Sequence, residues 1–139
     1  MMEIPWVKVE GRYLFHPYLV HFPIALFVLE AFLVFLWIVR RDEKYENFSF
    51  FVLKTAVLTF PFVMLAGYWD AGGLVPRVRT HFILAATFFI FNSVRLSIRW
   101  KMGPQLWRGG WRVIYPALVL ISVLLTILTA HFGGKLVYF

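Results

Sequence analysis

Apolar residues fill four long stretches of this chain, and most charged residues lie in the short segments between them. A bilayer core of about 30 Å needs roughly 20 apolar residues in helical conformation. Each stretch comes close to that length and is apolar all round, without the polar face of a soluble helix or the alternation of a barrel strand. The pattern predicts membrane-spanning helices at residues 17–39, 51–69, 81–98 and 113–130.

Short connections favour antiparallel packing of consecutive helices. We therefore expect an all-α fold: an integral membrane four-helix bundle with up-down-up-down topology, forming a single domain over residues 1–139. The sequence shows no evident internal repeat and no interdomain linker.

The composition supports a membrane protein. Hydrophobic residues make up 61% of the 139 residues and charged residues 15%, against roughly 45–50% and about 25% in soluble domains. This excludes a soluble enzyme, a disordered chain and a nucleic-acid-binding module, although the formal net charge is +7. Cysteine is absent, so any metal or cofactor must be held by His, Met or oxygen ligands.

Lysine and arginine residues in the loops predict the orientation in the membrane. We call the face at which residues 17–39 begin side A, and the opposite face side B. The basic residues assigned to side A are Lys8, Arg12, Arg77, Arg79 and Lys135, and those assigned to side B are Arg40, Arg41, Lys44, Arg95, Arg99, Lys101, Arg108 and Arg112. The excess places side B in the cytoplasm. Both termini then lie on the outer face of a bacterial or archaeal cytoplasmic (inner) membrane, which the chain crosses several times.

All four histidines fall at side A: His16, His21, His81 and His131. His21 lies about one turn inside the first apolar stretch, where an ionisable residue is expected to face the bundle and find a partner. We expect the same of His131. For His16 and His81, which open helices, solvation or helix capping is the alternative to a functional role.

Neutral imidazoles from different helices, without cysteine, fit a haem iron with two axial ligands, or copper or zinc. His16 and His21 are five residues apart and point about 140° apart on a helix, so they are not expected to share an iron. We expect His21 and either His81 or His131 to ligate one b-type haem; two haems would need all four histidines. Guanidinium groups of Arg77, Arg79 or Arg12 would pair with the propionates.

A second group of polar residues lies inside the predicted helices towards side B: Glu30, Lys54, Asn92 and Arg95. A buried carboxylate is costly unless it is paired or neutralised. We expect these residues to meet, either as an interhelix ion pair that fixes packing or as a proton-transfer or quinone-binding group.

Several segments carry a family resemblance. Residues 16–26, HPYLVHFPIAL, resemble the opening motif of the small bacterial membrane proteins catalogued as domain of unknown function twenty-two thirty-one. Gly67 and Asp70 resemble the end of that family's second helix, His81 the start of its third, and residues 133–138, GGKLVY, its closing motif. The resemblance implies a four-helix membrane protein, with a redox setting beside Rieske-type or cytochrome domains.

These observations lead to one function and two alternatives. The first is a membrane-embedded b-type haem electron-transfer protein or cytochrome subunit, working at the outer face between a quinol or membrane complex and a Rieske-type or c-type cytochrome protein. It would not be an enzyme on its own. The alternatives are a cofactor-free accessory or assembly subunit of a larger membrane complex, and a metal or small-solute transporter. Partners include the lipid bilayer and a further copy of the chain, and exclude nucleic acid.

Overall fold

The computed structural model describes residues 8–9, 12–13 and 15–138. Four long helices dominate it: α2 (His21–Arg40), α3 (Glu43–Ala71), α4 (Pro76–Met102) and α5 (Trp111–Tyr138). A one-turn helix, α1 (His16–Leu19), precedes α2, and a 3₁₀ helix, η1 (Gly103–Trp107), follows α4. Near the N-terminus, β1 (Lys8–Val9) pairs antiparallel with β2 (Arg12–Tyr13).

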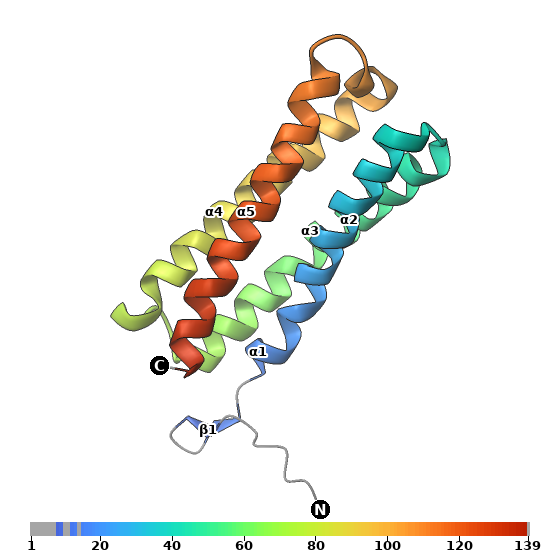
Figure 1. The fold of residues 1–139 in the computed structure, drawn as a ribbon. Coiled ribbons are helices and arrows are strands. Elements are labelled where there is room, and N and C mark those ends of the chain that lie inside the picture. Colours follow the sequence, from blue (N-terminus) through green and yellow to red (C-terminus); the bar gives the residue numbers. More distant parts are fainter. Residues whose placement is uncertain (1–7, 10–11, 14, 139) are drawn as a thin grey trace, which may run out of the picture.

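The long helices form two antiparallel hairpins, α2 with α3 and α4 with α5, which lie side by side (Figure 1). Between the hairpins, α3 packs against α4, and α5 packs against α2. The helices α2 and α4 therefore face each other across a diagonal of the bundle. The start of α1 and the end of α5 lie at the same end of the bundle (Figure 1). The predicted all-α four-helix fold is confirmed.

The bundle exposes apolar side chains and buries several polar ones beside its apolar core. Among the described residues, the outer surface carries large apolar side chains such as Trp69 and Phe62, 81% and 72% exposed, while the interior holds polar residues: Glu30, Ser49, Asn92, Arg95, Arg99, Ser122 and Thr126. Four helical segments are long and apolar enough to cross a membrane. An apolar exterior is stable only against lipid, so the chain is a multi-pass membrane protein.

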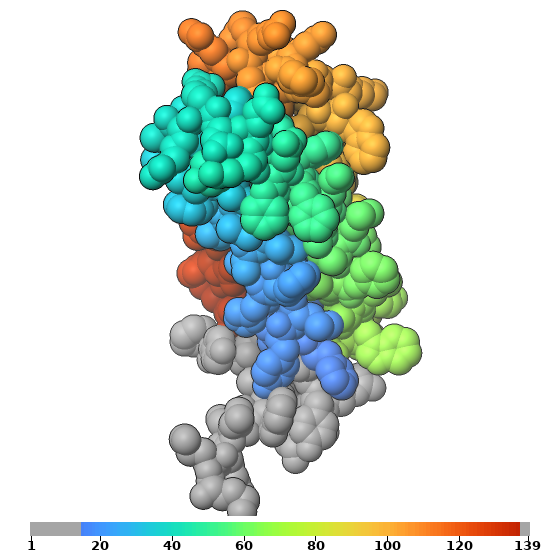
Figure 2. Space-filling model, turned by 90° about the vertical axis from the view of Figure 1, so that its right-hand side faces the viewer, coloured from blue at the N-terminus to red at the C-terminus, as the bar shows by residue number. Residues whose placement is uncertain are grey.

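The helices extend beyond the predicted apolar stretches at nearly every end. The helix α3 begins at Glu43, where the Asp42 carboxylate accepts a hydrogen bond from the Lys44 backbone N–H at 3.0 Å. Such a side-chain cap lets a helix start in a charged segment, before the membrane core is reached. The turn between α2 and α3 consists of Arg41 and Asp42, and it lies beside the segment around η1 at side B (Figure 2).

A single turn residue, Val20, lies between α1 and α2. Proline has no backbone N–H, so Pro23 has no hydrogen bond to donate to the carbonyl four residues earlier, at Leu19. Val20 keeps helical torsion angles, its N–H bonds the His16 carbonyl, and its own carbonyl accepts from the Ile24 N–H. The first helical turn, which carries His16, therefore continues into α2.

A candidate histidine site and a buried charge network

Two histidines meet at the side A end of the bundle. The imidazoles of His16, on α1, and His81, on α4, lie edge to face with ring centroids 5.9 Å apart and an interplanar angle of 72°. Both side chains are partly buried. The two rings thus come from different hairpins and approach each other across the diagonal of the bundle.

Each ring is held through its Nδ1 atom. His16 Nδ1 lies 2.9 Å from the Val63 carbonyl oxygen on α3, and His81 Nδ1 lies 3.1 Å from the Thr129 carbonyl oxygen on α5. A carbonyl oxygen only accepts hydrogen bonds, so Nδ1 donates in both cases and carries the proton. In the neutral imidazole, Nε2 is then left with its lone pair. Within the described residues, neither Nε2 has a hydrogen-bond partner.

A glycine lies beneath each ring. A Cβ atom added at Gly67 would be 2.9 Å from His16 Nδ1, and one added at Gly133 would be 2.8 Å from His81 Cε1. Both distances are shorter than real contacts, so any side chain there would displace the ring. Both glycines lie inside helices. The absence of a side chain at these positions lets an imidazole ring lie close to the helix backbone.

Asp70 fixes α1 against the end of α3. Its Oδ2 atom accepts a hydrogen bond of 2.7 Å from the backbone N–H of His16. In the described residues Asp70 forms no ion pair with Arg77 or Arg79 and no bond to a histidine ring. It therefore positions the turn that carries His16.

The other predicted ligands lie on the outside. His21 and His131 are exposed, and the His131 ring contacts Phe132 edge to face at 5.7 Å between centroids. Arg77 and Arg79 are also exposed at side A, where Arg77 Nη2 donates to the Leu136 carbonyl oxygen at 3.2 Å. The side chain of Arg12 lies outside the described part of the chain. The structure thus brings together His16 and His81, and it does not bring His21 to either of the rings proposed as its partner.

Within the described residues, no three His, Cys, Asp or Glu side chains converge as a metal-binding group. A metal ion at His16 and His81 would receive two protein nitrogen atoms and would have to bring its remaining ligands. A group that brings its own equatorial ligands, as a porphyrin does, meets that requirement.

The layer beneath the histidines is apolar and filled. The rings of Phe27 and Phe88 lie 4.7 Å apart between centroids, and Phe60 lies 5.2 Å from Phe88. The histidine ring centroids lie 5.9 Å apart at side A, so a macrocycle between them would need its room beside the rings.

A buried charge network occupies the bundle towards side B. Glu30 accepts a hydrogen bond of 2.8 Å from Arg95 Nη2 and faces Arg99 Nη1 at 3.5 Å, and all three side chains are 1% exposed. Arg99 also donates to Glu46 and to the hydroxyls of Ser49 and Tyr115. Two buried cations are thereby matched by one buried and one partly exposed carboxylate.

Of the four polar residues expected to meet, only two form a contact with each other. Glu30 and Arg95 pair as predicted. The Lys54 ammonium instead lies over the Phe50 ring at 4.7 Å, and Asn92 accepts a hydrogen bond of 2.8 Å from the Ser122 hydroxyl. Arg95 and Arg99 lie inside the bundle, so six of the basic residues assigned to side B remain in or beside its connections, against the five assigned to side A.

Sequence reasoning missed Arg99, Glu46 and the choice of histidines. Residues separated by 14 positions lie on nearly the same face of a helix. His16 precedes Glu30 by this spacing, and His81 precedes Arg95 by the same spacing. The charged residues therefore marked the interior face, and tracing that face back to side A leads to His16 and His81.

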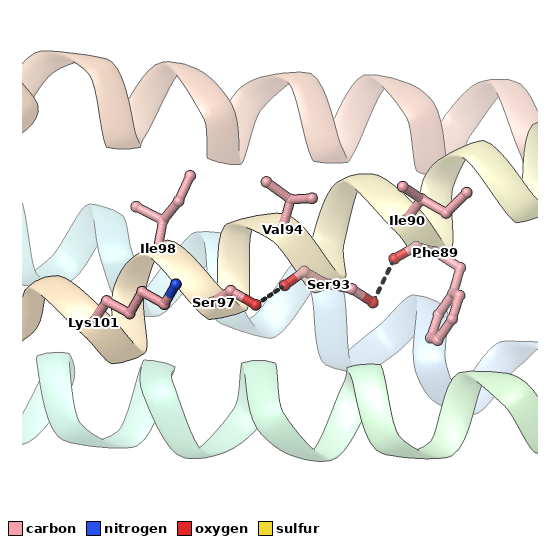
Figure 3. A pocket seen from close by; sticks show the side chains of 7 residues that line it. All are labelled: Phe89, Ile90, Ser93, Val94, Ser97, Ile98 and Lys101. Atoms are coloured by element: carbon pink, nitrogen blue, oxygen red, sulfur yellow. Dashed lines mark hydrogen bonds between the residues drawn. The ribbon is translucent and has the colours of Figure 1, made fainter.

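Neither of two hollows on the described surface is lined by His16 or His81. One runs along α4 and is lined by Phe89, Ile90, Ser93, Val94, Ser97, Ile98 and Lys101 (Figure 3). Its serine hydroxyls donate to carbonyls four residues earlier, at 2.8 and 2.9 Å. The other is lined by Leu74, Pro76, Arg79, Phe82 and Ile83.

Comparison with known proteins supports the resemblance. The family model described as "Predicted membrane protein (DUF2231)" matches residues 13–139. The chain belongs to this family. No curated protein and no solved structure matches it. The match spans both histidines of the pair, both glycines and the charge network, so all of these lie within the DUF2231 domain.

Proposed function

We propose that this DUF2231 protein is a b-type haem electron-transfer protein, in which His16 and His81 are the two axial ligands of one haem at side A. The observation that carries the proposal is the convergence of two imidazoles, each with Nδ1–H bound to a backbone carbonyl. Histidine ligands of metals commonly donate their other ring N–H in this way, which fixes the tautomer that leaves Nε2 free to coordinate.

The separation of the rings supports the same proposal. Two imidazoles that bind one metal from opposite sides, with metal–nitrogen bonds near 2 Å, have ring centroids roughly 6 Å apart. The observed 5.9 Å is close to that value. One pair supports one haem, and the exposed His21 and His131 would remain unligated.

The basic residues at side A could pair with the negatively charged propionates of a haem. Arg77 and Arg79 are exposed close to the start of α4, where guanidinium groups pair well with carboxylates. Haem would supply one-electron redox chemistry. The protein would orient it at the outer face of the cytoplasmic membrane, where a quinol or membrane complex would donate electrons and a Rieske-type or c-type cytochrome would accept them.

A cofactor-free accessory or assembly subunit is the second candidate, because the two rings already pair edge to face at 5.9 Å between centroids. In that role the imidazole contact would only join the hairpins.

A reduced-minus-oxidised absorption spectrum of the detergent-purified protein, with a pyridine haemochrome assay, tests the proposal. We expect a sharp α-band and one haem per chain after expression with ample haem. Absence of Soret and α-bands from a folded, monodisperse sample would refute haem binding and favour the accessory subunit.

A further inference from the structure

We infer that the chain is a tandem repeat of two helical hairpins, related by an approximate two-fold axis along the bundle, and that the histidine site consists of two equivalent halves. The first observation is the site itself. In each hairpin, a histidine at the start packs on a glycine near the end. Its Nδ1 binds the carbonyl four residues before that glycine: Val63 before Gly67, and Thr129 before Gly133.

The burial pattern extends the equivalence along the whole hairpin. A shift of 65 residues, the separation of His16 and His81, superposes buried positions of α2 on buried positions of α4. The pairs are Pro23 with Phe88, Phe27 with Asn92, Glu30 with Arg95, and Val34 with Arg99.

The second helices match with a shift of 66 residues, the separation of Gly67 and Gly133. Here the buried pairs are Ser49 with Tyr115, Leu53 with Val119, Ala56 with Ser122, and Phe60 with Thr126. The single extra residue falls between the two helices of the second hairpin, where η1 replaces the tight turn at Arg41 and Asp42. Few of the paired residues are identical, which is why the repeat is visible in the burial and not in the sequence.

Two contacts between equivalent residues locate the axis. His16 meets His81 at side A, and Glu30 meets Arg95 deeper in the bundle. Equivalent positions touch one another only on a two-fold axis. Two identical charges could not be buried there in contact, so the two halves must differ at this position, and they carry opposite charges.

This symmetry specifies how the site binds, which rests on the proposed function. The two histidines occupy equivalent positions across the axis, so together they would hold a single metal centre between the two hairpins. A substrate held by one hairpin alone does not fit this arrangement. Gly67 and Gly133 are then positioning residues with equal roles, because each sets the place of one ring.

Imidazole nitrogen NMR of the haem-free full chain tests the equivalence without any cofactor. The background carries His21→Ala and His131→Ala, which removes the exposed rings. We expect both remaining rings to be neutral Nδ1–H tautomers. Gly67→Ala should displace mainly the His16 signals and Gly133→Ala mainly the His81 signals. The matched control is Gly134→Ala, whose added Cβ has nothing within 4 Å, and it should change neither.

Haem titration of the same variants gives the second readout. Gly67→Ala and Gly133→Ala should each weaken binding by about 10- to 100-fold, as is typical of changes around a ligating histidine, and by similar factors, with Gly134→Ala unchanged. An Nε2–H tautomer in either ring, or an effect of Gly134→Ala equal to that of Gly133→Ala, would overturn the equivalence. If wild type binds no haem, the proposed function fails, while the NMR result still decides the repeat.

Exchanging Glu30 and Arg95, the charged pair on the two-fold axis, tests the repeat away from the histidines. Glu30→Arg combined with Arg95→Glu keeps one acid and one base on the equivalent positions, and the new carboxylate is one helical turn from Arg99. The double variant should therefore be more stable than Glu30→Arg alone, which buries three guanidinium groups together. A double variant that folds no better than the single one would contradict a two-fold relation at this level.

Discussion

At the scale of single residues, the side chains that matter most are polar groups buried in an apolar molecule. Arg95 and Arg99 are each 1% exposed, and several of their nitrogen atoms have no hydrogen-bond partner within the described residues. Desolvating such cations is costly unless a carboxylate compensates. Glu30 contacts both guanidinium groups, so it is the residue on which their burial depends.

Removing the Glu30 charge should therefore destabilise the bundle. We expect Glu30→Gln to lower the free energy of unfolding by about 3–5 kcal/mol, the usual cost of breaking a buried ion pair, measured by denaturant unfolding in detergent. Adding Arg95→Gln should recover part of the loss. Lys44→Gln is the control, because its ion pair with Asp42 is exposed and should matter little. Wild-type stability in Glu30→Gln would show that the arginines do not need this carboxylate.

At the scale of helices, the one-turn helix α1 is the least secured part of the site. It is the first turn of the helical segment that continues through Val20 into α2, and Asp70 holds its first backbone N–H at 2.7 Å. An end of this kind opens locally unless such a bond retains it. The position of His16 therefore depends on the end of α3 as well as on its own helix.

Asp70→Ala should loosen α1 without unfolding the bundle. Loss of one such hydrogen bond, about 1 kcal/mol, should speed amide exchange of residues 16–20 roughly fivefold. Asp70→Asn keeps an accepting oxygen and should exchange nearly as wild type does. Hydrogen exchange read by mass spectrometry measures both. Equal protection in Asp70→Ala and wild type would show that other contacts hold α1.

The helices and their order could be predicted from the sequence, because apolar runs alone determine which segments can cross a bilayer. Their ends could not, because Glu43 and Pro76 begin helices in segments outside the apolar core. The sequence also did not show which face of each helix points into the bundle. A helix that is apolar all round gives no sign of its rotation, so depth favoured His21, whereas the structure turns His16 inward.

At the scale of the whole molecule, the two ends of the bundle differ in their polar groups. The start of α1, the end of α5 and the histidine pair lie at side A, and the buried charges lie towards side B. With Arg95 and Arg99 inside the bundle, the excess of basic residues at side B rests on six residues in or beside its connections: Arg40, Arg41, Lys44, Lys101, Arg108 and Arg112. We predict that side B faces the cytoplasm.

Labelling of introduced thiols checks this orientation, since the chain has no cysteine of its own. The exposed positions Arg108 and Leu74 lie in the connections at side B and side A. In intact cells whose inner membrane is accessible from outside, a membrane-impermeant maleimide should label Leu74→Cys, and should label Arg108→Cys only after lysis. The reverse pattern would place the histidine pair in the cytoplasm.

The central claim is that His16 and His81 form one ligand pair while His21 and His131 do not. Haem content and the reduced-minus-oxidised spectrum of four single variants, each histidine changed to alanine, test it most directly. We predict that His16→Ala and His81→Ala each abolish the α-band of a folded protein, and that His21→Ala and His131→Ala keep one haem per chain. Loss of the band in His21→Ala, with haem retained in His16→Ala, would contradict the account.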